Sequence, residues 1–248
     1  MQNYAEWAPP REFAADVQCV WWSSFGGSAP ILPDGHVDLF VGAGRVLIAG
    51  PDTAAVANHL PEGLVVHGVR FRTGRARRVL GVPADELRDL RVGLDDLWGA
   101  AGRRASELLV DNPQRLLEVV RDRLAGTAEG PDRQIDAAVR RLVADRQRVA
   151  DLHDEVGLSE RQLRRRFTSE VGYGPATFLR IVRLQRARRL AREDPRLGLA
   201  DIASNAGYAD QAHMSREIKN LTGTTARILL RGRSVQDGQG KTFLRSTT

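Results

Sequence analysis

The chain has 248 residues, of which 42% are hydrophobic, enough to bury the core of one large domain or two ordinary ones. Its formal net charge of +6 comes almost entirely from arginine, because Lys219 and Lys241 are its only lysines. The single cysteine, Cys19, excludes a disulfide framework and a cysteine-rich zinc module. No apolar run is long enough for a membrane helix, and the N-terminus lacks the regions of a signal peptide. We therefore expect a cytoplasmic protein with no membrane partner.

The positive charge is concentrated in one half of the chain. Residues 1–131 contain 14 arginines and 17 acidic residues, a net charge of −3, whereas residues 132–248 contain 23 basic and 14 acidic residues, a net charge of +9. A general excess of arginine from genome composition would raise both halves alike. The C-terminal half is therefore the part expected to face a polyanion.

The segment Gly-Thr-Ala-Glu-Gly-Pro at residues 126–131 has a helix breaker at each end and is predicted to be a linker. We expect a domain over residues 1–125, a second domain over residues 132–231, and a flexible polar tail over residues 232–248.

The N-terminal half begins with strand-like runs at residues 17–22, 37–41, 45–49 and 64–71, separated by turn-forming segments. Short strands at this spacing predict a small antiparallel barrel or sandwich. Apolar residues at helical spacing follow over residues 87–97 and 108–124, which predicts helices after the β module.

Few groups in this half are suited to catalysis. His36, His59 and His67, with Asp34 and Asp38, do not have the spacing of a metal site, so we expect no enzyme activity, no metal and no other cofactor. A pocket for a small-molecule effector within the β module is the preferred interpretation. Its candidate residues are Trp21, Trp22, His36, His67 and Arg70.

The C-terminal half contains an internal repeat with an offset of 50 residues, most visible where Ala150-Asp151-Leu152 matches Ala200-Asp201-Ile202. Each copy has the pattern of a helix, a turn opened by glycine and a second amphipathic helix, which is typical of a helix-turn-helix unit. The equivalent residues are Gly157, Leu163, Phe167 and Gly172 in the first copy, and Gly207, Met214, Ile218 and Gly223 in the second.

In the first copy, Ser159 and Gln162 have the spacing of a capping box, which predicts a helix from Glu160 to about Ser169. Arginine pairs with guanine and glutamine with adenine, and the second helix of this motif enters the major groove. This placement favours DNA reading over the alternative of a solvated basic face. The candidate DNA contacts are Arg161, Gln162, Arg164 and Arg165.

In the second copy, the corresponding helix is expected from about Asp210 to Leu221. Its polar faces carry the candidate DNA contacts Gln211, His213, Ser215, Arg216 and Lys219. His213 has two open interpretations, a base contact or a cap or phosphate contact.

A helix predicted over residues 176–192 joins the two copies and is roughly 26 Å long. This length can place two reading helices near the roughly 34 Å repeat of successive major grooves. Leu179, Val182 and Leu190 are expected to pack against the two units. Of its six arginines we expect about two to contact phosphates, from the set Arg180, Arg183, Arg186, Arg188, Arg189 and Arg192.

Three motifs over residues 132–231 resemble the AraC/XylS family of bacterial transcriptional regulators: residues 157–167, Gly172-x-x-Pro175, and residues 207–219. The resemblance implies two groove-reading helices with DNA contacts at the positions given above, and at Ala212, which offers only a methyl group. Two positions depart from the family pattern, His153 in place of a small alanine and Ala226 in place of a proline.

The N-terminal half is similar to the family only in its order of strands and then helices. This similarity implies an α+β chain whose first domain is a small cupin-like β-barrel that binds an effector. It also implies a homodimer formed through the helices of residues 87–97 and 108–124, although these helices could instead only cover the β module.

The leading hypothesis is a sequence-specific regulator of transcription that binds double-stranded DNA, responds to a small molecule and contacts RNA polymerase. The alternatives are an effector-independent or architectural DNA-binding protein, and an enzyme fused to a DNA reader, as in some DNA-repair alkyl-transfer proteins. That repair chemistry needs several metal-bound cysteines, which Cys19 alone does not supply. Activation and repression remain open.

Overall fold

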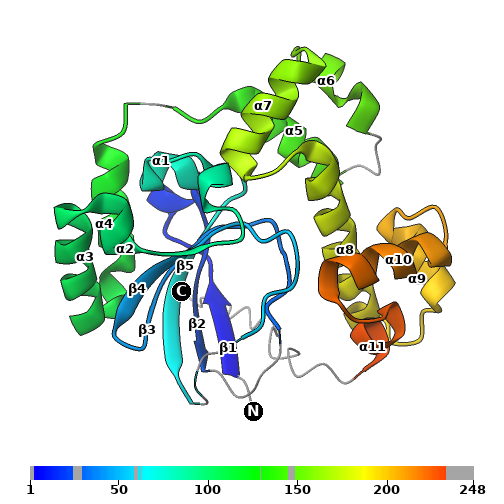
Figure 1. Cartoon of the computed structure of the whole chain (residues 1–248), viewed down its shortest axis with the longest axis horizontal. Helices are drawn as coiled ribbons and strands as arrows, with labels where there is room; N and C mark the ends of the chain where they lie inside the picture. Colours follow the sequence, from blue (N-terminus) through cyan, green and yellow to red (C-terminus); the bar gives the residue numbers. More distant parts are fainter. Residues whose placement is uncertain are drawn as a thin grey trace, which may run out of the picture.

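A computed structural model describes residues 3–24, 30–58, 61, 63–128, 130–144 and 149–232. The fold is α+β: an antiparallel sheet with short helices forms the N-terminal half, and helices alone form the C-terminal half (Figure 1). No helix in the described part of the chain is long and apolar enough to cross a membrane. Residues 233–248, most of the predicted tail, and Glu129 of the predicted linker lie outside the described residues.

The sheet has six strands in the order β1-β2-β5-β3-β4-β6, and all neighbours pair antiparallel. The four predicted strands are present with ends shifted by two residues or fewer, and two edge strands were not predicted. The described strands form an open sheet, so the predicted closed barrel is not confirmed. The strands are β1 (Asn3–Trp7), β2 (Val17–Ser24), β3 (Asp38–Gly42), β4 (Arg45–Ala49), β5 (Val65–Phe71) and β6 (Arg91–Gly93).

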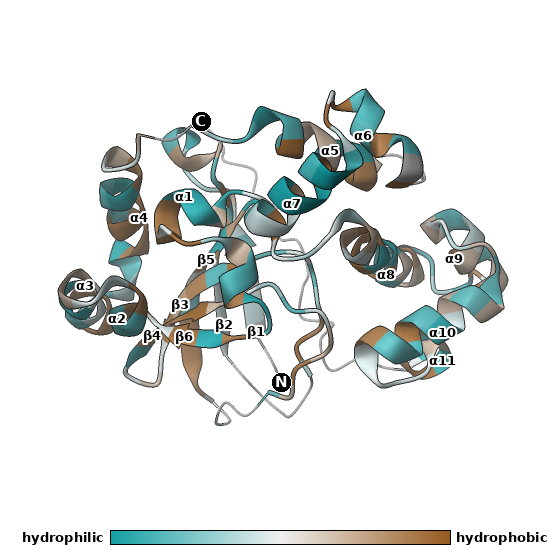
Figure 2. Ribbon diagram, turned by 45° about the horizontal axis from the view of Figure 1, so that its top comes forward, coloured by the Kyte–Doolittle hydropathy of each residue, from teal (hydrophilic) through white to brown (hydrophobic). Residues whose placement is uncertain are grey.

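The two faces of the sheet have different surroundings. One face contributes Leu39, Ile48 and Val69 to a core completed by side chains from the N-terminal helices, such as Leu109 and Val120. The hydrophobic residues of this sheet and of the helices beside it can be followed in Figure 2. Burial of these apolar side chains fixes the helices against that face.

The opposite face carries a smaller cluster around Trp21. A Cβ atom at Gly68, the residue paired with Trp21, would lie 2.4 Å from the indole ring. Glycine at this position therefore makes room for the ring to lie flat on the neighbouring strand.

The N-terminal helices are α1 (Ala76–Leu80), α2 (Leu94–Trp98), α3 (Ala100–Asp111) and α4 (Leu116–Ala125). The helix predicted over residues 87–97 is wrong, because that segment contains a 3₁₀ turn (Ala84–Leu87), strand β6 and only then α2. Asp89 adopts a φ of 60°, and β6 pairs with β4. Pairing with the sheet thus prevails over a leucine spacing that suits a helix.

The C-terminal half contains α5 (Arg133–Ala144), α6 (Leu152–Glu155), α7 (Glu160–Val171), α8 (Pro175–Glu193), α9 (Leu199–Ala206), α10 (Gln211–Thr222) and α11 (Ala226–Arg231). The pairs α6–α7 and α9–α10 are the two predicted helix-turn-helix units, and α8 joins them (Figure 1). Phe167, Phe178, Ile181, Ile202 and Ile218 belong to one continuous core. The two units therefore share a core with the helix between them.

Two positions that depart from the family pattern, His153 and Ala226, can be located in the structure. His153 is half-buried, with Nδ1 3.0 Å from a carboxylate oxygen of its neighbour Asp154. Thr225 caps α11 directly before Ala226, since its side chain accepts a hydrogen bond from the Ile228 N–H. The Thr225 cap thus starts the last helix although its first residue, Ala226, is not a proline.

Candidate nucleic-acid interface

Both helix-turn-helix units turn at a glycine in the left-handed region. Gly157 has a φ of 67° and Gly207 a φ of 91°. Side chains other than glycine adopt this backbone only at a cost. The repeated glycines therefore set the angle between the two helices of each unit.

The first reading helix, α7, starts at the predicted capping box. The Gln162 N–H donates to Ser159 Oγ at 3.3 Å, and the Ser159 N–H donates to Gln162 Oε1 at 3.0 Å. Leu163 and Phe167 are buried, which orients the helix about its axis. The side chains left exposed are Glu160 at the first position and the four candidates Arg161, Gln162, Arg164 and Arg165.

The outer surface of α7 is hydrophilic in Figure 2. Gln162 has its carbonyl oxygen engaged in the capping box, so only its amide N–H groups remain for a base or a phosphate. Arg165 has no ion pair among the described residues, unlike the neighbouring Arg166, which makes two hydrogen bonds to Asp132. The three exposed arginines are thus the groups of α7 with the most donors available.

The second reading helix, α10, is capped by Asp210, whose carboxylate accepts the His213 N–H at 2.6 Å. Met214 and Ile218 are fully buried. Ser215 Oγ donates to the Gln211 carbonyl at 2.8 Å, which leaves its lone pairs as acceptors. The exposed side chains include Gln211, Ala212, Arg216 and Lys219.

His213 differs from the other candidates, because its ring lies against the protein. Its Nδ1 accepts the Ala209 N–H at 3.3 Å, and its Nε2 lies 3.4 Å from Glu217 Oε1. The ring also meets Tyr208 edge to face, with centroids 5.5 Å apart. These contacts give His213 a bracing function between the turn and α10.

Most of the arginines of α8 are engaged within the protein. Arg180 pairs with Glu217 at 3.3 Å, Arg183 lies over the Tyr208 ring, and Arg186 donates to the Val143 carbonyl at 2.9 Å. Arg188 donates to Gln185 at 3.0 Å, whereas the exposed Arg189 is 3.9 Å from Glu193. Arg192 is exposed too, so Arg189 and Arg192 are the α8 arginines best placed for phosphate contacts.

The five candidate effector residues do not share one face of the sheet. Strand register places Trp22 opposite His67 on the face that packs against the helices. Trp21 and Arg70 lie on the opposite face, with Phe40 beside Trp21. The alternation of side chains along a strand separates the two tryptophans.

A polar cluster surrounds Arg70 on that second face. The guanidinium makes two hydrogen bonds to Asp38, at 2.9 and 3.0 Å, and pairs with Asp34 at 3.2 Å. Burial, the largest single effect, opposes ionisation of Asp34, but the attraction of Arg70 together with that of His36 and Arg188 and the His36 backbone hydrogen bond outweighs it, so the pKa of Asp34 lies below its usual value. His36 belongs to the same turn, since its N–H donates to Asp34 Oδ1.

Sequence reasoning missed two residues beside this cluster, Tyr4 and Glu6, because β1 was not predicted. The Tyr4 hydroxyl donates to Glu6 Oε2 at 3.0 Å. Cys19 lies 3.7 Å from the same oxygen, and burial raises the pKa of its thiol to about 12. Residues 3–7 have no regular alternation of polar and apolar side chains, so the two aromatic residues Tyr4 and Trp7 are the only local signal for this strand.

Two further residues on the reading helices were also missed, Asp210 as a cap and Glu217 as a partner of both Arg180 and His213. Asp210 could have been found from its position directly before the helix. Among the described residues no group of three histidine, cysteine or acidic side chains could hold a metal ion, and His59 lies outside them.

Comparison with protein-family models matches two segments of the chain. Residues 152–232 match a helix-turn-helix domain, which covers both units described above. Residues 5–93 match a domain of unknown function, which covers the sheet. No curated protein matches the chain significantly.

Several solved structures are similar along most of the chain. They include an apo form of a single-substitution variant of ToxT from Vibrio cholerae strain SCE256, with 14% identity, a TM-score of 0.47, and coverage of 93% of this chain and 96% of that chain. ToxT from Vibrio cholerae O395 has 10% identity and a TM-score of 0.45, with coverage of 93% and 96%. Wild-type ToxT from Vibrio cholerae strain SCE256 with a bound unsaturated fatty acid has 12% identity and a TM-score of 0.43, with coverage of 93% and 94%.

Proposed function

Since its helix-turn-helix domain makes this chain a member of the AraC/XylS family of transcriptional regulators, we propose that it reads two adjacent major grooves of one promoter. The observation that carries the proposal is the pair of exposed, arginine-bearing helices α7 and α10 at either end of α8. That helix has 19 residues and is roughly 28 Å long. Its length suits two helix-turn-helix units, called heads below, that bind successive major grooves on one face of DNA.

Within each head, we assign contacts with DNA bases to exposed side chains. Side chains that bind other protein groups are assigned to holding the helix in place. Arg165 and Arg216 are the proposed base readers, because arginine can contact guanine O6 and N7 together. His213 is assigned to bracing α10. The remaining proposed contacts, to bases or phosphates, are Arg161, Gln162, Arg164, Gln211, Ser215 and Lys219.

We further propose that a small molecule controls the protein through the Arg70 face of the sheet. Trp21 Nε1 is buried and has no hydrogen-bond partner among the described residues, so a polar ligand atom could satisfy it. The loop that carries Asp34 reaches α8, where Gln185 donates to the Pro33 carbonyl. A movement of Arg70 on ligand binding could therefore be transmitted through this loop to α8, the helix that separates the two heads.

The remaining partners follow from this function. A regulator that binds promoter DNA acts in the cytoplasm of a bacterium and contacts RNA polymerase. Homodimerisation through α3 and α4 is the proposed assembly, and the exposed Val110 on α3 fits such an interface. Two copies would then read a longer, repeated site.

The test is binding to the region upstream of its own gene, measured against random duplex over a range of salt. We expect a steep fall in affinity with salt and a preference of about 10³-fold or more for the specific site. Equal affinity for random duplex would instead indicate an architectural DNA-binding protein.

Two variants extend this test to single residues. Arg165→Ala and Arg216→Ala should each cost about 1–3 kcal/mol on the specific site and relax preference at different base positions. Arg45→Ala, at the exposed start of β4 and outside both the reading helices and the proposed dimer helices, is the matched control and should change nothing. Equal weakening of every sequence by both variants would place these arginines on phosphates.

A further inference from the structure

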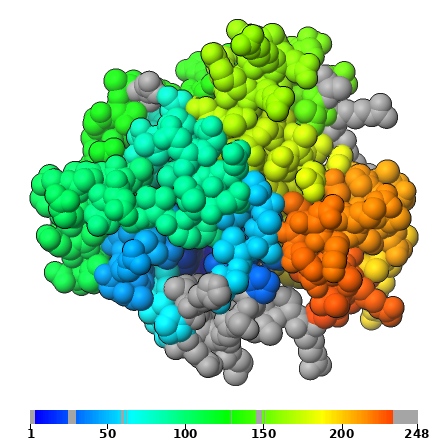
Figure 3. Space-filling model, viewed as in Figure 1, coloured from blue at the N-terminus to red at the C-terminus, as the bar shows by residue number. Residues whose placement is uncertain are grey.

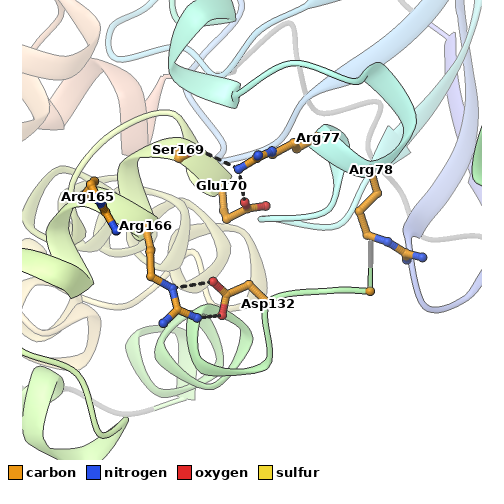
Figure 4. A pocket seen from close by; sticks show the side chains of 8 residues that line it. Arg77, Arg78, Asp132, Arg165, Arg166, Ser169 and Glu170 are labelled. Carbon is orange, nitrogen blue, oxygen red and sulfur yellow. Dashed lines mark hydrogen bonds and ion pairs between the residues drawn. The ribbon is translucent and has the colours of Figure 1, made fainter. Parts of the chain in front are cut away.

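A pocket of about 590 Å³ lies where the N-terminal half meets the first reading helix. Three segments line it: α1, the residues just before α5, and the C-terminal part of α7 (Figure 4). In Figure 3 the atoms of the N-terminal half lie directly against those of the C-terminal half. The lining residues are Arg77, Arg78, Gly130, Asp132, Arg165, Arg166, Ser169 and Glu170.

The lining has four arginines and two acids, an excess of positive charge. Both acids are already paired, Glu170 with Arg77 at 3.0 Å and Asp132 with Arg166 at 2.6 Å. Arg78 pairs with Asp16, which lies outside the lining. The charge of Arg165 is the one left without an ion pair in the described part of the chain, so the pocket attracts an anion.

The pocket also adjoins the surface that α7 presents to DNA. Arg165 and Ser169 are one helical turn apart and therefore share a face of α7. Arg165 is exposed on the reading side, while Ser169 accepts a hydrogen bond from Arg77 at 3.2 Å. Arg77 is itself 37% exposed, so it is accessible from the same opening.

We infer that this pocket seats a phosphate of the DNA backbone, held by Arg77 of α1 beside Arg165 of α7, whose guanidinium reads a base and whose charge adds to the attraction. The inference rests on the proposed DNA-binding function and extends it to the N-terminal half. A helix in the major groove has a sugar-phosphate strand along each flank, and phosphate contacts fix its register. The net acidic N-terminal half thus contributes to DNA binding through one local basic site, and it clamps DNA beside the first head.

The test compares Arg77→Gln and Glu170→Gln in the full chain, with DNA affinity measured over a range of salt. Both changes remove the same ion pair between α1 and α7. Loss of a phosphate contact in Arg77→Gln should lower the slope of log affinity against log salt by about 0.9 and weaken binding about tenfold near 0.1 M salt, equally on all sequences. Glu170→Gln removes a negative charge beside the phosphate and should bind DNA as tightly as the wild type or more tightly.

Weaker DNA binding by Arg77→Gln, together with equal or tighter DNA binding by Glu170→Gln, supports a phosphate in this pocket. Equal weakening by both variants would show that the ion pair only holds the two halves together, and would overturn the inference. Arg45→Gln, at the exposed start of β4, controls for the loss of one positive charge and should leave the slope unchanged. Melting temperatures of the variants check that each is folded.

Free phosphate is the other source of the same chemistry. The inference would be overturned by two results together. Inorganic phosphate at matched ionic strength would raise the melting temperature of the wild type but not of Arg77→Gln, and both proteins would have equal salt slopes on DNA. The pocket would then be a site for a small anion. The wild-type measurement separates this result from a failure of the proposed function, which would appear as equal affinity for specific and random duplex.

Discussion

At the scale of single residues, the proposed DNA contacts differ in how the surrounding protein holds each side chain. Gln162 was a candidate from its position on α7, and it is both exposed and engaged in the capping box. His213 was a candidate from its position on α10, and its ring faces Glu217 and Tyr208. These partners lie only three to five residues away, but the spacing of residues does not show which of several possible partners a side chain contacts.

Asp34 illustrates a residue whose charge the fold stabilises. Burial, the largest single effect, raises its pKa, but Arg70, His36 and Arg188 together hold the pKa below the usual value. A depressed carboxyl pKa contributes stability above the pKa of the unfolded chain, near 4, and that stability is lost as the pH falls through the folded pKa.

Asp34→Asn should therefore lower the free energy of unfolding at pH 7 by about 1–3 kcal/mol. The difference from the wild type should shrink as the pH falls below about 4, because the wild-type carboxylate then becomes protonated as well. Urea unfolding at pH 7 and pH 3 measures both values. A difference that stays constant over this range would contradict the assignment, and the exposed Asp111→Asn on α3 serves as control.

At the scale of elements, the C-terminal half was predictable because its signals are local. Caps, turn glycines and a repeated apolar spacing lie within each unit, and α7, α8 and α10 start and end within two residues of their predicted positions. Strands β1 and β6 were not predicted, since five- and three-residue edge strands are defined by the partners they pair with. The pairing of β6 with β4 is also the reason why residues 87–97 do not form the predicted helix.

The turn of the first unit gives a test at this scale. A Cβ atom at Gly157 would meet only Gln134 Nε2, at 3.8 Å, so the cost of Gly157→Ala is conformational. With a φ of 67°, it should be about 1–2 kcal/mol in the free energy of unfolding. The measurement is urea unfolding of the full chain.

Gly126→Ala is the matched comparison, because Gly126 has a φ of −82° and room for a methyl group. It should leave stability unchanged or raise it by up to about 1 kcal/mol. Equal destabilisation by both changes would show that glycine matters here for space and not for backbone angle.

At the scale of the whole molecule, the sequence predicted two parts but not how they meet. The N-terminal half contacts both helix-turn-helix units: Arg77 pairs with Glu170 of α7 at 3.0 Å, and the Ala55 N–H donates to the Leu221 carbonyl of α10 at 2.8 Å. These contacts join residues separated by as many as 166 positions, beyond any periodicity in the sequence. They hold α7 and α10 in one arrangement, with α8 between them (Figure 1).

The central claim is that this arrangement reads two successive major grooves. A hydroxyl-radical footprint of the wild-type protein on its specific site tests it most directly. The account predicts two protected patches on one face of the duplex, about one helical turn, or roughly 34 Å, apart for each bound chain. A single patch per chain, or two patches that do not lie on the same face, would contradict it.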